Sequence, residues 1–253
     1  MRFSDKVAIV TGAASGICAA AALRFAKEGA FVVAVDINKD GLSEMTKEAK
    51  KNGYSIEARV CDVSSEPDVE NAVSLTLSTY GKIDILVNGA GMLLTKRTAE
   101  TSFREYSRLM DINMGGVFLF VNKVLPQMEK QNFGSIVNVA SELAFVGDAE
   151  YAAYSATKGA IVSFTRCVAI DAMSYGVRVN CVCPGATDTP LFWEGATGSG
   201  ERKIILDKFM EGNPLGRLVS AEEVANGITF MASDDASAVI GACLVMDRGY
   251  TIM

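Results

Sequence analysis

Histidine is absent from all 253 residues of the chain. Without it the protein cannot build a Ser-His-Asp or Cys-His catalytic centre, nor a metal site with histidine ligands. Histidine is also the side chain whose ordinary pKa lies closest to neutral pH. If the protein performs acid–base chemistry, the pKa of another residue must be shifted for that task.

Cysteine is sparse, and its spacing excludes common metal and redox motifs. The chain has six cysteines, without a Cys-x-x-Cys pair or a zinc-finger spacing: Cys18, Cys61, Cys167, Cys181, Cys183 and Cys243. Cys181 and Cys183 fall in an apparent strand, where alternate residues point to the same face. We interpret the cysteines as buried free thiols, which is typical of proteins in a reducing cytosol.

Long apolar and long basic runs are also missing. No stretch of 18 apolar residues occurs, and residues 1–6 lack the apolar region of a signal peptide. The net charge is −6 and no basic cluster offers a nucleic-acid footprint. We therefore expect a cytoplasmic protein that binds neither nucleic acid nor a membrane.

Short apolar runs alternate with longer helix-like stretches along the chain. The runs are Val7–Val10, Phe31–Val35, Ile56–Val63, Ile83–Asn88, Ser135–Ala140, Val177–Val182 and Cys243–Met246. The helix-like stretches are Gly16–Glu28, Lys39–Asn52, Glu66–Tyr80, Ser102–Lys130, Tyr151–Ser174 and Ala221–Ala232. This alternation is typical of a parallel sheet covered on both faces. We predict an α/β fold, a doubly wound parallel seven-stranded sheet formed by residues 1–253 as a single domain.

The first apolar run leads into a glycine-rich turn that contains Gly12, Ser15, Gly16 and Ile17. Glycines let the backbone approach a ligand closely, and the helix that follows would offer its first N–H groups to a pyrophosphate. The order of strand, glycine-rich turn and helix therefore predicts a dinucleotide-binding site.

Asp36 closes the second strand, 20 residues after Gly16. A carboxylate there can accept hydrogen bonds from the ribose hydroxyls of an adenosine, and it would repel a 2′-phosphate. Neither Ser15 nor Ile37 supplies a compensating positive charge. The sequence thus favours NAD over NADP, although Asp36 could also cap the next helix.

Two further segments end predicted strands. Asp62 and Val63 end the third strand, and Asn88–Gly91 ends the fourth. Open parallel sheets bind ligands at this carboxyl edge. Asp62 could hydrogen-bond the adenine, while the small residues Ala90 and Gly91 would let the cofactor lie close. Each segment could instead be an ordinary turn.

Tyr154 and Lys158 are four residues apart and so share one face of a predicted helix. A phenol with a pKa of about 10 is a poor base near neutral pH, but an adjacent cation lowers that pKa. Ser141 could hydrogen-bond a substrate oxygen. The trio predicts proton transfer to or from an alcohol or carbonyl. The pair alone is equally compatible with a packed tyrosine and a surface lysine.

Residues 185–214 break the alternation of strands and helices. This stretch contains several glycines together with Phe192 and Trp193, and it is too long for an ordinary connection. We interpret it as a candidate substrate lid. A structural excursion or a subunit contact is the alternative.

Together these motifs resemble the short-chain dehydrogenase/reductase family, in its short single-domain branch, over essentially the whole chain. The resemblance rests on Thr11–Cys18, Asp62, Asn88–Gly91, Asn113, Ser141, Tyr154 with Lys158, Asn180, and Pro184-Gly185 followed by Thr189. It implies a Rossmann fold, a nicotinamide cofactor and a homotetramer. The segments Ser102–Lys130 and Tyr151–Ser174 could then be interface helices.

The resemblance also implies roles for the catalytic residues. Tyr154 is the acid and base at the substrate oxygen, and Ser141 orients that oxygen. Lys158 lowers the pKa of Tyr154 and binds the nicotinamide ribose. Asn113 holds a water that links Lys158 to a proton relay.

The family pattern places other residues along the cofactor. Those expected at its nicotinamide end are Pro184, Gly185, Thr187 and Thr189. Those expected along the rest of the dinucleotide, besides the glycine-rich turn, are Ile17, Asp36, Ile37, Asp62, Val63, Asn88, Ala90 and Gly91.

Three positions depart from the family pattern. Cys18 replaces the third glycine, so a thiol must fit where helix and strand pack closely, and pyrophosphate binding could weaken. Gly89 replaces an asparagine, which we expect to be harmless. Arg248 replaces a glycine and could alter a subunit contact or the mouth of the substrate site.

We therefore expect an NAD-dependent enzyme that interconverts a secondary alcohol and its ketone. Polyols, sugars, cyclic alcohols and hydroxysteroids are all candidate substrates. The alternatives are a 3-oxoacyl thioester reductase, which Asp36 disfavours, and a non-catalytic dinucleotide-binding protein, which the intact catalytic residues disfavour. The candidate substrate residues are Glu142, Leu143, Phe145, Glu150 and Trp193, and we expect no metal.

Overall fold

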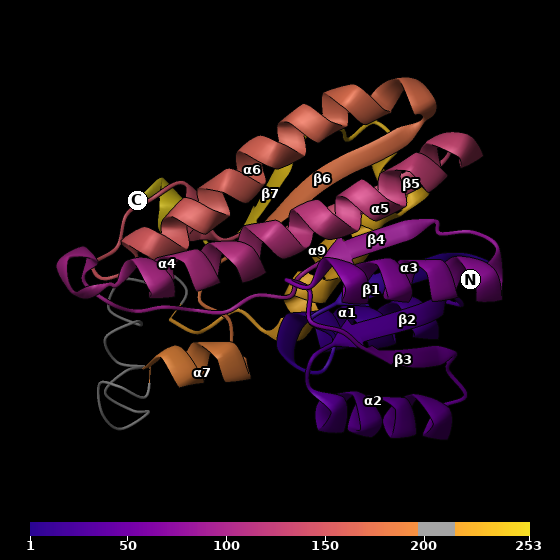
Figure 1. Ribbon diagram of the computed structural model, residues 1–253, viewed down its shortest axis with the longest axis horizontal. Helices are drawn as coiled ribbons and strands as arrows, with labels where there is room; N and C mark the ends of the chain where they lie inside the picture. Colours follow the sequence, from indigo (N-terminus) through magenta and orange to yellow (C-terminus); the bar gives the residue numbers. More distant parts are fainter. Residues whose placement is uncertain (197–215) are drawn as a thin grey trace.

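A parallel sheet forms the centre of the protein, as the computed structural model shows for residues 1–196 and 216–253 (Figure 1). The strands are β1 Val7–Thr11, β2 Phe31–Asp36, β3 Ile56–Val60, β4 Ile85–Asn88, β5 Gly134–Val139, β6 Val177–Pro184 and β7 Cys243–Met246. They form a seven-stranded sheet in the order β3-β2-β1-β4-β5-β6-β7, and every neighbouring pair is parallel. The chain winds outward from β1 to β3 and then returns beside β1 with β4. The predicted doubly wound fold is therefore confirmed.

Helices cover both faces of the sheet. On one face lie α1 (Gly16–Lys27), α2 (Lys39–Lys51) and α9 (Ala221–Ala232); on the other lie α3 (Glu66–Tyr80), α5 (Gly116–Gln131) and α6 (Ala152–Ala172). The structure also has α4 (Phe103–Met110) and α7 (Pro190–Ala196). Short helical turns lie at η1 Thr98–Glu100, η3 Glu142–Ala144, η4 Met173–Tyr175, η6 Asp234–Ala236 and η7 Tyr250–Ile252.

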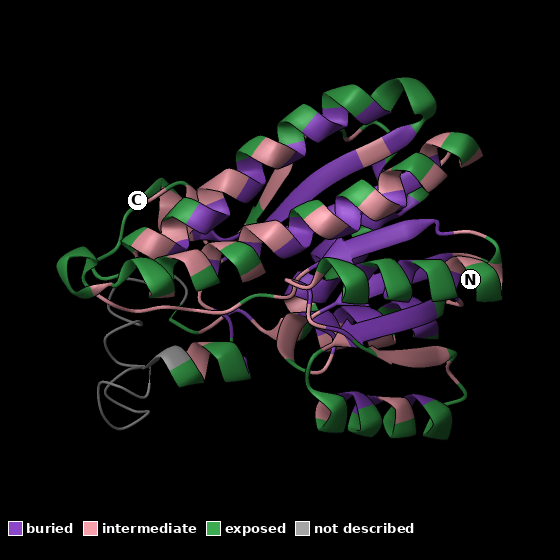
Figure 2. Ribbon diagram, viewed as in Figure 1, coloured by how far each residue is buried: buried purple, intermediate pink, exposed green. Residues whose placement is uncertain are grey.

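The central strands are apolar throughout because both of their faces are buried. In β1, Ile9 faces the core formed with α3, α5 and α6, whereas Ala8 and Val10 face the core formed with α1 and α9. This is the alternation that the pleat of a strand imposes. Complete burial of a Val or Ile side chain stabilises a fold by about 1.5–3 kcal/mol. Figure 2 shows the buried strands between helices whose outer faces are exposed.

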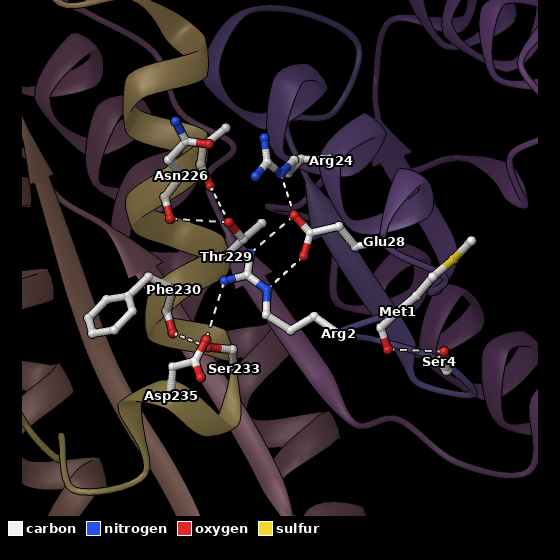
Figure 3. A network of polar contacts seen from close by, with 11 residues as sticks. Met1, Arg2, Ser4, Arg24, Glu28, Asn226, Thr229, Phe230, Ser233 and Asp235 are labelled. Atoms are coloured by element: carbon white, nitrogen blue, oxygen red, sulfur yellow. Dashed lines mark hydrogen bonds and ion pairs between the residues drawn. The ribbon is translucent and has the colours of Figure 1, made fainter.

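The first residues are fastened to two distant parts of the chain (Figure 3). Arg2 Nε donates to Glu28 Oε2 at 2.6 Å, and Arg2 Nη1 lies 3.7 Å from Asp235 Oδ2 in η6. Phe3 is buried, with its ring centroid 4.8 Å from that of Phe25 in α1. Exposed ion pairs contribute little to stability, so the burial of Phe3 is the stronger of these attachments.

One predicted helix, Ser102–Lys130, is divided in the structure. α4 ends at Met110, a π-helical segment η2 (Asp111–Gly115) follows, and α5 continues from Gly116. The Gly116 N–H donates to the Asp111 carbonyl, five residues back instead of four. Such a turn inserts one residue into the helix and is frequent at functional sites. Asn113 lies within it.

The predicted strand Ile56–Val63 ends early, at Val60. The chain leaves the sheet there because Asp62 closes a local turn, its Oδ1 accepting from the Ser64 N–H at 2.9 Å. Asp62 and Val63 therefore follow the strand instead of ending it.

Only part of the candidate lid, residues 185–214, can be placed. Its beginning holds an isolated parallel bridge between Thr187 and Val219, then α7. Residues 197–214 lie outside the described residues. Among the helices that are described, none is long and apolar enough to cross a membrane.

Candidate active site

A single hydroxyl joins the carboxyl ends of β1 and β4. Thr11, the last residue of β1, accepts hydrogen bonds at Oγ1 from the Gly89 N–H at 3.0 Å and the Ala90 N–H at 3.2 Å. The strand order reverses between β1 and β4, which is where open sheets form a ligand crevice. The predicted glycine-rich turn and the segment 88–91 therefore lie side by side.

Gly12 and Gly16 adopt backbone conformations that favour glycine, with φ of +72° and +58°. A Cβ on Gly12 would lie 2.8 Å from the Ala90 backbone, and one on Gly16 would lie 3.2 Å from the Thr189 side chain. Thr189 thus reaches the turn from the segment that follows β6. The two glycines therefore allow the segments at Ala90 and Thr189 to pack closely against the turn.

The amino terminus of α1 lacks a side-chain partner. Ser15 is the N-cap residue but makes no capping bond, and the first turn holds no acidic side chain. By contrast, Ser102 and Ser220 form complete capping boxes at the starts of α4 and α9. α1 therefore keeps its first N–H groups and its positive dipole end available to an anion.

Asp36, which was expected to bind a ribose, hydrogen-bonds the backbone of the glycine-rich turn. Its Oδ2 accepts the Ala14 N–H at 3.0 Å, and its Oδ1 accepts the Asn38 N–H at 2.8 Å. Each carboxylate oxygen can still accept a second hydrogen bond. The next residue, Ile37, is 63% exposed and carries no charge.

Asp62 and Asn88 already make hydrogen bonds within the protein. Asp62 Oδ1 accepts the Ser64 hydroxyl at 2.6 Å, and this bond holds the pKa of Asp62 below its ordinary value. Asn88 is buried and its Nδ2 donates to Asn138 Oδ1 at 2.9 Å, between β4 and β5. The Asn88 Oδ1 has no hydrogen-bond partner. Asp62 retains a second oxygen that could meet an adenine.

Ser141, Tyr154 and Lys158 meet where β5 ends against α6. The Ser141 side chain lies close enough to the Tyr154 phenol to influence its pKa. The Lys158 Nζ lies 5.5 Å from the Tyr154 ring centroid and donates to the Val139 carbonyl at 3.0 Å. The exposed fractions of Ser141, Tyr154 and Lys158 are 8%, 9% and 5%. Lys158 is therefore not a surface lysine, and the alternative interpretation of the Tyr-Lys pair is wrong.

Burial shifts the two titratable groups in opposite directions. It raises the pKa of the Tyr154 phenol, and the Ser141 side chain offsets part of that rise. It lowers the pKa of the Lys158 ammonium to about 8. The expected lowering of the Tyr154 pKa is not seen here, because desolvation of the phenol dominates and the ammonium is directed at Val139.

Asn113 is fully buried and crosslinks three segments. Its Oδ1 accepts the Met92 N–H at 2.8 Å, and its Nδ2 donates to the Met92 carbonyl at 3.0 Å and to Thr157 Oγ1 at 3.1 Å. Thr157 in turn donates to the Tyr154 carbonyl at 2.7 Å. Both amide hydrogens are thus used within the protein. Its side chain could bind a water only through the second lone pair of Oδ1.

Gly91 leaves space between Asn113 and Lys158. A Cβ on Gly91 would lie 3.2 Å from Asn113 Oδ1 and 3.9 Å from Lys158 Nζ. The absence of a side chain there keeps one side of the catalytic trio open.

The segment after β6 folds across the same edge. Pro184 ends the strand, the Gly185 N–H donates to the Met246 carbonyl at 3.1 Å, and Thr187 Oγ1 donates to the Gly185 carbonyl at 2.7 Å. Together with the approach of Thr189 to Gly16, this brings residues 184–189 between the catalytic trio and the start of α1. The assignment of this segment to the nicotinamide stays a prediction.

Glu142 differs from the other candidate substrate residues because it is buried. It follows Ser141, is 9% exposed, and its Oε2 has no hydrogen-bond partner. Burial and the neighbouring Asp247 raise the pKa of Glu142 to about 8, although the Ala186 N–H partly opposes this. The sequence shows only that Glu142 follows Ser141. The missing hydrogen-bond partner of its Oε2 is apparent only in the structure.

The remaining substrate candidates are scattered and more accessible. Leu143 is half-buried, Phe145 is 44% exposed, and Glu150 is exposed. Trp193 Nε1 donates to Asp188 Oδ1 at 2.6 Å in the candidate lid. Among the substrate candidates, Leu143 contacts Ser141 directly, because its N–H donates to Ser141 Oγ at 3.2 Å.

Two of the departures from the family pattern belong together. A Cβ on Gly89 would lie 2.1 Å from the Cys18 sulfur, so the thiol occupies the space of a residue-89 side chain. Cys18 is buried, which raises its pKa to about 12. The third departure, Arg248, has φ of 58° and points to Glu223 in α9 at 3.5 Å.

Comparison with known proteins identifies relatives along the whole chain. Residues 12–251 match the family model described as enoyl-(acyl carrier protein) reductase. The chain is 38% identical to the meso-2,3-butanediol dehydrogenase of Serratia marcescens, over 99% of this chain and 96% of that protein. It is 36% identical to the 3-oxoacyl-[acyl-carrier-protein] reductase FabG of Thermotoga maritima, over the full length of both.

Solved structures of similar proteins share the fold closely. An NAD⁺-bound xylitol dehydrogenase matches with a TM-score of 0.93 and 32% identity, over 98% of this chain and 100% of the other. An actinorhodin polyketide ketoreductase with NADPH matches with a TM-score of 0.95 and 32% identity, over 100% and 99%. With these matches and its sheet of seven parallel strands, the chain belongs to the short-chain dehydrogenase/reductase family.

Proposed function

We propose that the protein is an NAD(H)-dependent oxidoreductase that interconverts a secondary alcohol and its ketone. The observation that carries this proposal is the joint burial of Ser141, Tyr154 and Lys158 where β5 ends against α6, with the Lys158 Nζ 5.5 Å from the Tyr154 ring centroid. The family supports an oxidoreductase that uses a nicotinamide dinucleotide, and relatives such as the butanediol dehydrogenase support an alcohol substrate.

The residues at the carboxyl edge of the sheet fit a dinucleotide. The uncapped start of α1 and the glycine-rich turn at Gly12 and Gly16 suit a pyrophosphate. Asp36 suits a ribose, and residues 184–189 suit the nicotinamide. When bound, this cofactor would supply the hydride acceptor for alcohol oxidation, or the hydride donor for ketone reduction.

Asp36 and Ile37 support NAD as the preferred form of the cofactor. The Asp36 carboxylate would oppose the 2′-phosphate of NADP, and the exposed Ile37 cannot neutralise it. The solved relatives include both NAD⁺ and NADPH complexes. The preference therefore rests on these two residues and not on family membership.

The catalytic trio would handle the proton of the reacting oxygen. In oxidation, Tyr154 Oη takes the proton of the substrate hydroxyl while the Ser141 hydroxyl donates a hydrogen bond to the same oxygen. Burial lowers the pKa of Lys158 to about 8. Its ammonium would favour the phenolate only if it turned from the Val139 carbonyl toward the phenol. Asn113 joins the loop that carries Met92 to Thr157 in α6, and thereby holds the backbone next to Tyr154.

Glu142 supports a substrate with a second hydroxyl group. Its buried Oε2 lacks a partner beside Ser141, and a buried polar atom is stabilised when a ligand supplies the missing hydrogen bond. A hydroxyl near the reacting carbon can either donate to or accept from this carboxyl group. Polyols and diols therefore fit better than alcohols without a second polar group, and the nearby Asp247 disfavours an anionic substrate.

Two other expectations stay predictions. The homotetramer is supported by the exposed apolar side chains of Phe118 in α5 and Ile170 in α6, which are 49% and 66% exposed. The cytoplasmic location is supported by six cysteines outside disulfides.

The decisive variant is Tyr154→Phe, which removes the proton-accepting oxygen and keeps the ring. We expect kcat to fall at least about 10²–10⁴-fold, because general acid–base catalysis contributes that much. NADH formation from a panel of polyols, diols and cyclic alcohols measures turnover, and titration of NADH fluorescence measures cofactor binding. Binding should change by less than about 3-fold, since Tyr154 makes only one of many cofactor contacts.

The same assays separate the alternatives. Near-native turnover by Tyr154→Phe would contradict the proposed role of the phenol. Wild-type protein that binds NADH but oxidises nothing in the panel would favour a non-catalytic dinucleotide-binding protein. Faster reduction of a 3-oxoacyl thioester with NADPH would favour the acyl-carrier function of the FabG relative.

A further inference from the structure

Three cysteine side chains come together where β6 and β7 pair, and none of them is among the residues proposed to bind the cofactor. Cys181 and Cys183 lie two residues apart on β6 and point to the side of α6. Cys243 begins β7 and is the register partner of Cys181. All three Sγ atoms lie within 4.8 Å of one another, and those of Cys181 and Cys183 are 3.6 Å apart. None of the three is in a disulfide.

These separations suit one metal ion bound by three sulfurs. Zinc–sulfur bonds are about 2.3 Å long, so two sulfurs of a tetrahedral site lie about 3.8 Å apart. The pair on β6 already has nearly that spacing, because the pleat of one strand holds both residues. The Cys243 sulfur lies within 4.8 Å of the other two, so it would have to approach them by at most about 1 Å to complete the triangle. Thiolates select soft cations over Mg²⁺ and Ca²⁺.

The charge near Cys243 also suits a thiolate site. A divalent cation that displaces the protons of three thiols leaves a net charge of about −1. The Arg166 side chain, on α6, lies close enough to Cys243 for its positive charge to offset that negative charge. A group of thiols that only filled the core would need no such cation.

An ion could reach the cluster from solvent. β7 is the last strand of the sheet order, Cys243 is half-buried, and Arg166 beside it is exposed. Cys181 and Cys183 are fully buried. The ion would thus be held from the inside by two sulfurs of β6. A water on the Cys243 side can complete a fourfold site, since the chain has no histidine to do so.

We infer that Cys181, Cys183 and Cys243 form a binding site for one thiophilic divalent cation of the Zn²⁺ and Cd²⁺ class. In binding, three sulfur–metal bonds form, the thiol protons pass to solvent, and no electron is transferred. The inference does not depend on the proposed oxidoreductase activity, because no cofactor or substrate residue is among the three ligands.

The test is an anaerobic titration of the reduced, chelator-treated full-length protein with Cd²⁺. Sulfur-to-cadmium charge-transfer absorption in the ultraviolet reports thiolate ligation, and a pH indicator in weak buffer reports the released protons. We expect absorption that saturates at about one ion per chain. Cys243→Ser should weaken binding by at least about 100-fold, since even second-shell changes cost 10–100-fold.

Cys167→Ser is the matched control, because Cys167 lies next to Arg166 on α6 but is exposed and outside the cluster. Its affinity for Cd²⁺ should stay within about 2-fold of wild type, and Zn²⁺ should compete for the site in both proteins. Circular dichroism establishes that each variant is folded.

Several results would overturn the inference. One is wild-type protein without saturable cadmium–thiolate absorption, which is decisive even if a variant fails to fold. Others are equal affinity in folded Cys243→Ser, and loss of the signal in Cys167→Ser, which would assign binding to the exposed thiol.

Discussion

Cys18 and Gly89 share one small space at the start of the cofactor crevice. They are far apart in sequence, and each departs separately from the family pattern. In the structure the Cys18 sulfur would lie only 2.1 Å from a Cβ on Gly89. The thiol at position 18 is therefore accommodated by the absence of a side chain at position 89, and the two departures compensate for each other.

This compensation predicts strong coupling between the two positions. Gly89→Ala should lower the free energy of unfolding by about 1–3 kcal/mol, because overpacking a filled site carries that cost. In a Cys18→Ala background the sulfur is gone, so Gly89→Ala should cost less than about 1 kcal/mol. Urea unfolding of the two single variants and the double variant gives the coupling energy.

Cys61→Ala is the control for this cycle, because Cys61 is also a buried free thiol but follows β3. Its effect and that of Gly89→Ala should simply add. Additive effects of Cys18→Ala and Gly89→Ala would contradict the shared-space interpretation.

At the scale of whole elements, α1 is unlike α4 and α9 in lacking a capping side chain. The helix gives up the ~1 kcal/mol that a good cap contributes, and its free N–H groups face the glycine-rich turn. The sequence offered a serine at this position, which is an ordinary capping residue. The φ of −158° and ψ of 170° at Ser15, with no capping bond, are visible only in the structure.

Ser15→Asp should have opposite effects on the stability of α1 and on the binding of the cofactor. A carboxylate at the N-cap should stabilise α1 and raise the free energy of unfolding by up to about 1 kcal/mol. The same charge would repel a pyrophosphate and should weaken NADH binding at least about 10-fold. Urea unfolding and NADH fluorescence titration measure the two effects.

Ser102→Asp introduces the same charge at the capped start of α4 and serves as the control. It should leave NADH binding within about 2-fold of wild type. If Ser15→Asp binds NADH as tightly as wild type does, the start of α1 is not the pyrophosphate site.

The sequence could predict most elements but not the π-helical segment η2. Strands and helices follow from apolar alternation and length, which are local properties. The extra residue at Asp111–Gly115 depends instead on where Asn113 finds partners, and these are Met92 and Thr157, distant in sequence. The family motif identified Asn113 itself. Its three hydrogen bonds could not be predicted, because they are made to residues distant in sequence.

At the scale of the whole molecule, the order of the strands decides which predicted residues meet. Motif order correctly indicated a cluster at the carboxyl edge, because all strands are parallel. It could not indicate that Glu142 would be enclosed together with Gly185 and Asp247, since that requires β5, β6 and the chain after β7 to converge. Buried charge of this kind arises from tertiary structure and has no local sequence signal.

The burial of Glu142 should make the stability of the whole protein depend on pH in an unusual direction. Its folded pKa of about 8 lies above the ordinary value of 4.5. The folded state therefore keeps a proton that the unfolded state has lost at intermediate pH. Since the unfolded state binds fewer protons, the Glu142 contribution to the free energy of unfolding falls as pH rises from about 4.5 to about 8.

Glu142→Gln removes this titration and preserves the size of the side chain. The difference in unfolding free energy, variant minus wild type, should rise by on the order of 3 kcal/mol between pH 5 and pH 8.5, at 1.36 kcal/mol per pKa unit. Urea unfolding at both pH values measures it, and every other titrating group largely cancels between the two proteins. An imperfect hydrogen bond of the glutamine would change the unfolding free energy by the same amount at both pH values, so it would not affect this comparison. A difference that does not change with pH would mean that Glu142 is ionised in the folded protein, and its carboxylate would then only accept hydrogen bonds from a substrate.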